Sequence, residues 1–216
     1  MGRRRWVVLS LLVIAIGMLT GCSLFNQAPT ANFTWTPSDP LARTDVQFTD
    51  LSSDSGGLFG GGGVVSWNWD FGDNSYSPSQ NPKHEYERGG TYQVKLTVTD
   101  GGGSSTTIQK AITVIPSLDG TWIGYMTDLA YNQWTLQLNL HHSASGGITG
   151  TMSRGNQTQV ITSATFDPVS REVQITSLMF GQTLRGTLNA SEDKISGFWY
   201  DAVGGWRGED WSVNLQ

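Results

Sequence analysis

Cysteine is almost absent from this sequence of 216 residues, because Cys22 is the only one. A single cysteine excludes a disulfide bond within the chain. An exported protein with one free thiol would be unusual, so Cys22 needs a chemical explanation of another kind.

Recognisable catalytic patterns are absent as well. The sequence holds no G-x-S-x-G elbow, no phosphate-binding loop and no H-E-x-x-H pair, and it has only three histidines. His141 and His142 are neighbours on an expected strand, so their side chains point to opposite faces and cannot share a metal ion. Glu209 and Asp210 are likewise neighbours on an expected strand, so their side chains also point to opposite faces. We therefore expect no enzyme, no catalytic residue, no metal site and no cofactor.

Long hydrophobic runs are lacking apart from Trp6–Leu19, which follows the basic residues Arg3–Arg5. A helix over this run would span about 21 Å, less than the ~30 Å hydrocarbon core of a bilayer. A basic segment followed by a short apolar run predicts a cleaved export signal. An uncleaved anchor helix and an ordinary secretory signal are the alternatives.

The segment Leu19-Thr20-Gly21-Cys22 follows this run at once and resembles the bacterial lipobox. The resemblance implies that residues 1–21 are a lipoprotein signal peptide, that the sulfur of Cys22 receives a diacylglycerol, and that residues 22–29 form a lipidated tether. Ser23 is not the Asp that retains many lipoproteins at the inner membrane, so we expect the outer membrane or the cell surface.

Positive charge is scarce in the rest of the chain. Without Arg3–Arg5, ten basic residues remain against 18 acidic ones. This balance favours solubility and disfavours nucleic acid as a partner.

Beyond the tether, alternating apolar and polar residues separated by Gly, Asn, Asp, Ser and Pro predict an all-β protein. A break at Pro116–Gly120 divides it into residues 30–116 and 118–216. The first part contains Trp69-Asp70-Phe71-Gly72-Asp73-Asn74, then Asn81-Pro82, His84 and Tyr86, and then Gly90–Asp100. These motifs resemble the PKD domain, which implies an immunoglobulin-like β-sandwich of extracellular proteins with a spacer or adhesive role.

Two features depart from the PKD pattern. Asn74 stands where the family usually has Gly, and Asn is the next-best residue for a left-handed backbone conformation. The region Ser55–Val65 is rich in glycine and offers few carboxylates, so Asp50 and Asp54 alone do not predict a calcium site. We expect Asp70 and Asp73 to accept hydrogen bonds from turn amides, and His84 to be structural.

The second part, residues 118–216, is expected to form a small up-and-down antiparallel β-barrel. Its motif of an apolar residue, a glycine and an apolar residue at alternate positions recurs around Gly124, Gly150, Gly186 and Gly197. Inward glycines would relieve crowding where a sheet curves, and the last strand could pair with the first. About eight strands are expected, near Thr121–Thr127, Gln133–His142, Ile148–Ser153, Thr158–Asp167, Glu172–Leu178, Thr183–Asn189, Lys194–Asp201 and Trp206–Leu215.

The opening Gly120-Thr121-Trp122-x-Gly124 is loosely similar to the first strand of calycin-type barrels, the lipocalins and avidins. The five tryptophans of this part have two interpretations: they fill the barrel, or some of them line a ligand site. The ligand-binding candidates are Trp122, Trp134, Trp199, Trp206 and Trp211.

The expected function is that of a cell-envelope lipoprotein that binds without catalysis. In this hypothesis the PKD-like domain is a spacer, and the Trp-rich barrel binds a glycan or protein outside the cell. The alternatives are a structural envelope protein without a ligand pocket and a lipocalin-like carrier of a small apolar molecule.

Overall fold

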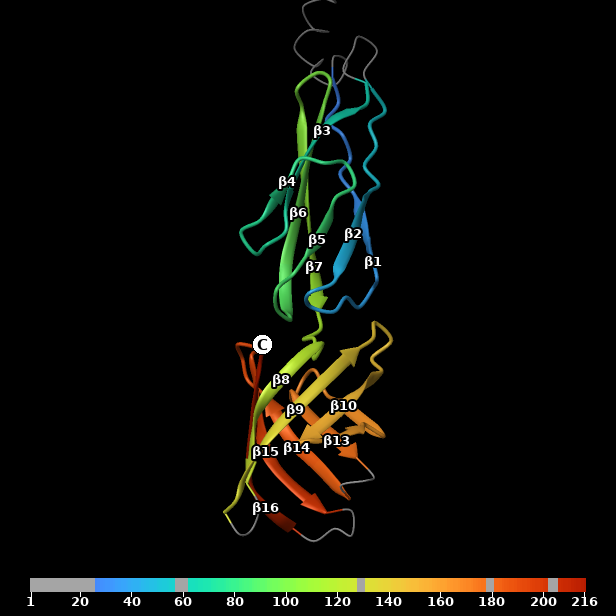
Figure 1. Cartoon of the computed structure of the whole chain (residues 1–216). Helices are drawn as coiled ribbons and strands as arrows, with labels where there is room; N and C mark the ends of the chain where they lie inside the picture. Colours follow the sequence, from blue (N-terminus) through green and yellow to red (C-terminus); the bar gives the residue numbers. More distant parts are fainter. Residues whose placement is uncertain (1–25, 57–61, 128–130, 178–180, 202–205) are drawn as a thin grey trace, which may run out of the picture. The chain divides into compact units, whose positions relative to one another are not determined.

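A computed structural model of the chain describes residues 26–56, 62–127, 131–177, 181–201 and 206–216, without the side chains of residues 201 and 206–209. Cys22 and the whole expected signal therefore lie outside the described residues. The described part is all-β and contains no helix that is long and apolar enough to cross a membrane. Its strands, all but β11 and β12 labelled in Figure 1, are β1 (Phe33–Thr36), β2 (Asp45–Asp50), β3 (Val64–Asp70), β4 (Tyr76–Ser77), β5 (Lys83–Glu85), β6 (Gly90–Asp100), β7 (Ser105–Val114), β8 (Gly120–Thr127), β9 (Gln133–His142), β10 (Ile148–Arg154), β11 (Gln157–Val160), β12 (Ser163–Phe166), β13 (Glu172–Ser177), β14 (Gln182–Leu188), β15 (Lys194–Asp201) and β16 (Trp206–Leu215).

The chain divides into two compact units. The first consists of Met1–Ser38, Asp45–His84 and Thr91–Ile112, and the second of Asp39–Thr44, Glu85–Gly90 and Thr113–Gln216. We describe the two β-structures separately.

The first structure is a two-sheet sandwich, with sheet order β1-β2-β5 on one side and β4-β3-β6-β7 on the other. Alternate side chains fill the space between the sheets, as the sequence pattern predicts. Trp69 lies at the centre with its side chain fully buried, and its ring centroid is 5.1 Å from that of Phe33 and 5.5 Å from that of Phe48. The indole N–H of Trp69 donates to the carbonyl of Ser79 at 2.9 Å, so the buried ring keeps its polar atom paired.

The turn after β3 has the conformation that its sequence predicts. Asn74 has a φ of 73°, in the left-handed region. The carboxylate of Asp70 accepts a hydrogen bond from the amide of Gly72, and that of Asp73 accepts one from the amide of Ser75, both at 3.0 Å. The prediction that these two carboxylates bond turn amides is confirmed.

The second structure is a nine-stranded antiparallel sheet in the order β11-β10-β9-β8-β16-β15-β14-β13-β12, curled into a barrel. The predicted pairing of the last strand with the first is confirmed, because β16 pairs with β8. The two edges of the sheet are instead β11 and β12, which are consecutive in the chain.

The expectation of eight strands in the barrel is corrected at one place. The segment expected as a single strand, Thr158–Asp167, forms β11 and β12. Between them, the amide of Ile161 donates to the carbonyl of Gly150 on β10, and the amide of Thr162 donates to that of Thr176 on β13, both at 2.9 Å. The chain thus crosses from one sheet edge to the other at Ile161–Thr162, and neither strand can continue through this crossing.

The four recurrent glycines are the places where neighbouring strands approach most closely. An added Cβ would lie 1.9 Å from the carbonyl oxygen of Ser212 at Gly124, and 1.9 Å from that of Asn139 at Gly150. At Gly186 it would lie 2.7 Å from the ring of Trp211, and at Gly197 it would lie 2.0 Å from the carbonyl oxygen of Arg185. The prediction that these glycines relieve crowding in a curved sheet is therefore confirmed.

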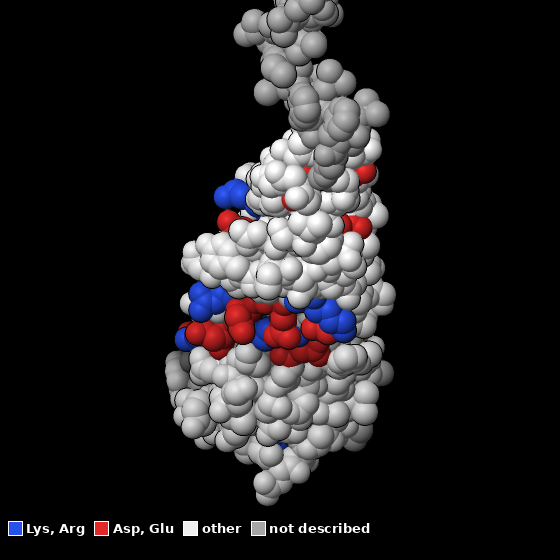
Figure 2. All heavy atoms as spheres, turned by 90° about the horizontal axis from the view of Figure 1, so that it is seen from above, with Lys and Arg blue, Asp and Glu red and all other residues white. Residues whose placement is uncertain are grey.

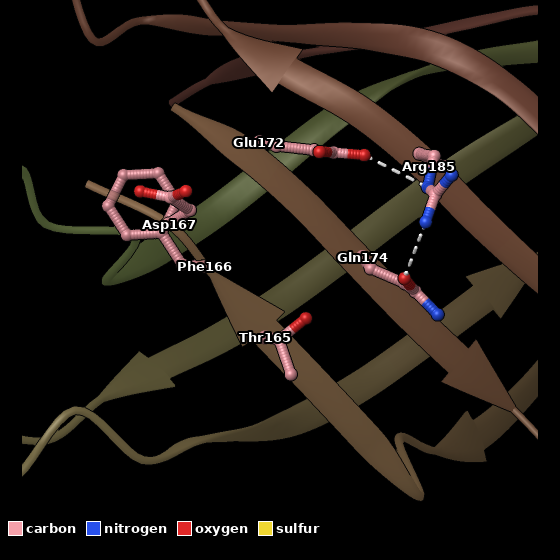
Figure 3. A pocket seen from close by; sticks show the side chains of 6 residues that line it. All are labelled: Thr165, Phe166, Asp167, Glu172, Gln174 and Arg185. Atoms are coloured by element: carbon pink, nitrogen blue, oxygen red, sulfur yellow. Dashed lines mark hydrogen bonds and ion pairs between the residues drawn. The ribbon is translucent and has the colours of Figure 1, made fainter. Parts of the chain in front are cut away.

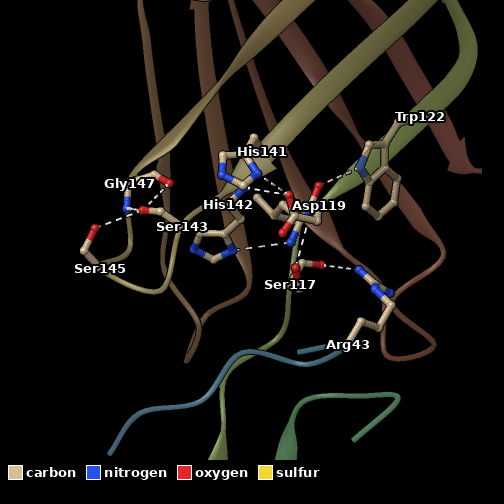
Figure 4. Close-up of polar contacts among 10 residues, drawn as sticks. Arg43, Ser117, Asp119, Trp122, His141, His142, Ser143, Ser145 and Gly147 are labelled. Carbon is tan, nitrogen blue, oxygen red and sulfur yellow. Dashed lines mark hydrogen bonds and ion pairs between the residues drawn. The ribbon is translucent and has the colours of Figure 1, made fainter. Parts of the chain in front are cut away.

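His141 and His142 lie on opposite faces of β9, as predicted. The side chain of His141 is largely exposed, whereas His142 is buried and its ring meets that of Phe166 edge-on at 5.9 Å. Asp119 joins the pair, because its Oδ1 accepts from the backbone amide of His142 at 2.9 Å and lies 3.0 Å from Nδ1 of His141 (Figure 4). Burial lowers the pKa of His142, and the Asp119 carboxylate opposes that shift.

Candidate functional site

Three of the five candidate tryptophans belong to the barrel core. Trp122, Trp199 and Trp211 are at most 5% exposed. Each indole N–H donates to a backbone carbonyl: Trp122 to Leu118 at 2.9 Å, Trp199 to Thr127 at 2.9 Å, and Trp211 to Phe198 at 3.0 Å and to Arg185 at 3.3 Å. The space-filling interpretation therefore describes these three rings, which present no face to a ligand at the surface.

Trp134 differs from them although it follows the same alternation on β9. Its cross-strand partner is the buried Met126, but the side chain of Trp134 stands at the end of the strand and is 45% exposed. The guanidinium carbon of Arg154 lies 5.9 Å from the centroid of its ring, a cation–π distance. Of the predicted residues whose side chains the structure describes, Trp134 alone presents its ring at the surface. The backbone of Trp206 pairs with Tyr200 in β16, and its side chain lies outside the described residues.

Polar groups continue from Trp134 along the same end of the barrel. Nη1 of Arg154 lies 3.4 Å from Oε1 of the buried Gln182, which pairs with Ser177 across β14 and β13. Ser177 is 1% exposed, and its hydroxyl has no hydrogen-bond partner among the described residues. A buried hydroxyl without a partner is costly, so a water molecule or a ligand atom is the natural way to satisfy it.

The resulting cluster of Trp134, Arg154, Gln182 and Ser177, here called the rim cluster, has the composition of a small binding site. It combines an aromatic face, a cation, an amide and a hydroxyl from four different strands. The sequence pattern identified Trp134 but not the other three. Arg154, Gln182 and Ser177 are brought together only by the pairing of strands that lie far apart in the chain.

The polar residues of the sandwich serve its turns. Nε2 of His84 lies 2.7 Å from Oδ2 of Asp73 and 3.3 Å from the hydroxyl of Ser75, and its ring stacks on Phe71 with 4.1 Å between centroids. Burial would raise the pKa of Asp73, but hydrogen bonds from Ser75 and His84 outweigh it and hold that pKa below its usual value.

These three residues do not form a catalytic triad. A triad needs the two ring nitrogens of histidine to face different partners, whereas here one nitrogen faces both Asp73 and Ser75.

Asp50 and Asp54, the two carboxylates that alone do not predict a calcium site, accept hydrogen bonds within the sandwich. Asp50 accepts from the indole of Trp67 at 2.7 Å and from the amide of Ser52 at 2.9 Å. Asp54 accepts from the amides of Gly56 at 3.0 Å and Gly63 at 2.9 Å, and so closes the base of the glycine-rich segment.

Charge is mixed on the surface. On the face that Figure 2 shows, acidic and basic side chains lie side by side in one band. Lys83 and Asp45, 2.9 Å apart, illustrate such pairing on the sandwich. A polyanion such as nucleic acid binds to a continuous basic surface, and this face, as far as it is described, does not present one.

The comparison with known families concerns the sandwich. The sequence of residues 26–114 matches the family model described as the PKD domain. Residues 26–114 form a PKD domain. This family match and the sheet arrangement agree with the motifs around Trp69 and with the immunoglobulin-like fold that they imply.

Two curated relatives and one solved structure each match less than half of the chain. Collagenase ColQ1 of Bacillus cereus (strain Q1) is 40% identical over 90 residues, which are 41% of this chain and 9% of the collagenase. The pre-pro-metalloprotease PrtV of Vibrio cholerae serotype O1 (strain M66-2) is 39% identical over 77 residues, which are 35% of this chain and 8% of the protease. Among solved structures, the PKD1 domain of Vibrio anguillarum Epp is 38% identical and covers 41% of this chain and 95% of that chain, with a TM-score of 0.36. The chain therefore spans less than a tenth of the length of these two curated relatives.

Proposed function

We propose that this protein is a cell-envelope lipoprotein that binds a glycan or a protein without catalysing a reaction. In this proposal the PKD domain is a spacer, and the barrel carries the binding surface. The observation that carries the proposal is the rim cluster, in which an exposed Trp134 lies against Arg154 beside a buried hydroxyl without a partner.

The packing of the barrel supports surface binding over the carrier alternative. The buried core includes the large rings of Trp122, Trp199 and Trp211 together with leucine, isoleucine, valine and methionine side chains from most of the strands. A carrier needs interior space for its apolar ligand. The packed interior favours a ligand that stays outside.

Replacing Trp134 by Ala is expected to weaken ligand binding at least about tenfold, because truncation of a tryptophan at the centre of a binding site often costs about 2 kcal/mol. The measurement is a titration of the purified protein with soluble oligosaccharides and with fatty acids, followed by NMR through the indole N–H signals. Tyr125→Ala is the matched control, because Tyr125 is also an exposed aromatic residue but lies on the opposite face of the β8–β9 hairpin.

Three outcomes separate the hypotheses. The proposal is supported if the Trp134 signal shifts on titration of the native protein and of Tyr125→Ala, and if ligand binding is lost in Trp134→Ala. Shifts of the buried Trp122 and Trp199 signals with fatty acids would support a carrier instead. If the folded protein gives no response to any of these probes, the glycan part of the proposal is wrong.

The lipid anchor has its own test. Cys22→Ala is expected to move the protein from the membrane fraction to the soluble fraction and to abolish incorporation of a labelled fatty acid, because the thiol that would carry the lipid is gone. Ser23→Ala should leave both unchanged. Membrane association that persists in Cys22→Ala without label would mean that Trp6–Leu19 is an uncleaved anchor.

A further inference from the structure

A second surface of the barrel, away from the rim cluster, forms a groove. Three adjoining cavities of about 180, 200 and 440 Å³ lie on the outer face of β12–β16. The first and second share Glu172 and Arg185, and the second and third share Ser196, Gly197 and Phe198. The shared residues make them one continuous groove that crosses the strands.

The register of the strands explains one wall of this groove. Five outward residues lie directly opposite one another from strand to strand, so they form a single row across the sheet. Figure 3 shows the beginning of this row, where Gln174 and Arg185 project beside Thr165. The complete row is Thr165, Gln174, Arg185, Phe198 and Asp210.

The opposite wall is low over β14–β16, where its side chains are short, and it continues on β13 with Glu172. Thr187, Ser196 and Ser212 form the neighbouring outward row on β14, β15 and β16. Between the two rows the floor is backbone at Gly186 and Gly197, which pair directly with each other. Long side chains on one side, hydroxyls on the other and glycines between them make the hollow.

The charges of the groove are largely balanced. Three carboxylates (Asp167, Glu172 and Asp210) and two cationic side chains (Arg185 and Lys194) line it. Nε of Arg185 lies 2.9 Å from Oε1 of Glu172, and its Nη2 donates to Oε1 of Gln174 at 3.3 Å (Figure 3). The central cation is thus already paired with Gln174 in its own row and with Glu172, which pairs with Thr187 in the neighbouring row, and this disfavours an anionic ligand.

The remaining lining identifies the ligand chemistry. Hydroxyl groups, the amide of Gln174 and aromatic residues that include Phe198 and Phe166 line a space that crosses four strand intervals, about 19 Å at ~4.8 Å each. Hydroxyls and amides both donate and accept hydrogen bonds, as sugar hydroxyls do.

We infer that this groove binds a linear, uncharged glycan chain, with one sugar ring packed on Phe198 and neighbouring units hydrogen-bonded to the hydroxyl wall. The inference deepens the proposed function by adding a ligand class and a second surface. It does not depend on the rim cluster, so the two can fail separately.

Isothermal titration of the purified protein with neutral oligosaccharides of increasing length tests this inference. The probes are cello-, xylo-, laminari- and manno-oligosaccharides from dimer to hexamer, with hexagalacturonate as the charged comparison. Binding of at least one neutral series is expected, with an affinity that rises with chain length because a longer chain fills more of the groove. Hexagalacturonate should bind at least tenfold more weakly.

Ser196→Arg is the decisive variant, because a long side chain at this exposed position fills the middle of the groove. It should weaken hexasaccharide binding at least tenfold, and Phe198→Ala should weaken it severalfold. Thr149→Arg is the matched control, since Thr149 is an exposed outward residue on β10, outside the groove, and should bind as the native protein does. Circular dichroism confirms that each variant is folded.

Each result has a definite meaning. If no neutral hexasaccharide binds to the folded protein, if hexagalacturonate binds best, or if Ser196→Arg binds as the native protein does, the inference is wrong. If Ser196→Arg loses binding while Trp134→Ala keeps it, the groove is supported and the rim cluster is contradicted. The reverse pattern would support the rim cluster alone.

Discussion

Replacing Trp211 by Ala is expected to remove about 3–5 kcal/mol from the free energy of unfolding of the barrel, the range observed for large buried aromatic residues. The side chain is 1% exposed and belongs to the core cluster. Met126 lies directly opposite Trp211 on β8, and Val213 is the next inward residue on β16. Its ring extends over Gly197 on the neighbouring strand β15 to the space beside Gly186 on β14, where an added Cβ would lie 2.7 Å from the ring. A truncation to Ala would leave that volume empty. The cavity could be filled only by a shift of β14 and β15.

The polar atom of Trp211 adds to this effect. Its N–H donates to the carbonyls of Phe198 and Arg185, which lie on two adjacent strands, and it lies next to the register shift in β15 between Phe198 and Tyr200. Trp211→Phe keeps an aromatic ring but removes this donor. We expect a smaller loss of about 1–3 kcal/mol, the typical cost of leaving a buried polar group without its partner.

Hydrogen exchange measured peptide by peptide in increasing urea separates the barrel from the sandwich in the same sample. Barrel peptides should lose protection at lower urea in Trp211→Ala, whereas peptides from β2, β3 and β6 should not change. Trp134→Ala is the matched control, because the same residue type at 45% exposure should cost less than about 1 kcal/mol. Equal effects of the two truncations would contradict the assignment of Trp211 to the core.

The contrast between these two tryptophans shows what the sequence can and cannot predict. Both follow the apolar alternation of their strands, and alternation predicted the all-β fold and most of the core side chains correctly. Burial also depends on where a strand leaves the sheet. Trp134 lies near the start of β9 and is 45% exposed although its cross-strand partner Met126 is buried, and nothing in the local pattern marks that difference.

The groove residues were beyond prediction for a related reason. Thr165 and Asp210 are separated by 45 positions in the chain, and they share a row only because four successive pairings are in one register. A shift of one residue in any pairing would turn one side of the row inward. The pairing of β15 with β16 also contains an irregularity between Phe198 and Tyr200, which no recognisable sequence motif marks.

The recurrent glycines were the informative exception. A glycine within a strand costs about 0.5–1 kcal/mol relative to Ala, so its repeated appearance at apolar positions requires a compensating contact. The structure provides that contact as close approach of neighbouring backbones at Gly124, Gly150 and Gly197, and as a tryptophan ring at Gly186.

Gly197→Ala is expected to destabilise the barrel by about 3 kcal/mol or more, and the sign of the change is itself diagnostic. Gly197 does not have a positive φ. If an added Cβ met no neighbouring atom, replacing Gly197 by Ala would therefore raise the free energy of unfolding by about 0.5–1 kcal/mol. The added Cβ would instead lie 2.0 Å from the carbonyl oxygen of Arg185 and 2.4 Å from the Cα of Gly186, both backbone atoms that no side-chain rotation can move. The strands β14 and β15 would have to separate, with loss of packing and of ladder hydrogen bonds.

Gly147→Ala is the matched control, because Gly147 is exposed and an added Cβ there would lie 3.1 Å from the hydroxyl of Ser143, the movable end of a side chain. The stability of Gly147→Ala should differ from that of the native protein by less than about 0.5 kcal/mol. Gly124→Ala should behave like Gly197→Ala, because its added Cβ would lie 1.9 Å from the carbonyl oxygen of Ser212. A stability gain in Gly197→Ala, read from the same urea series, would mean that curvature is not the reason for the glycine.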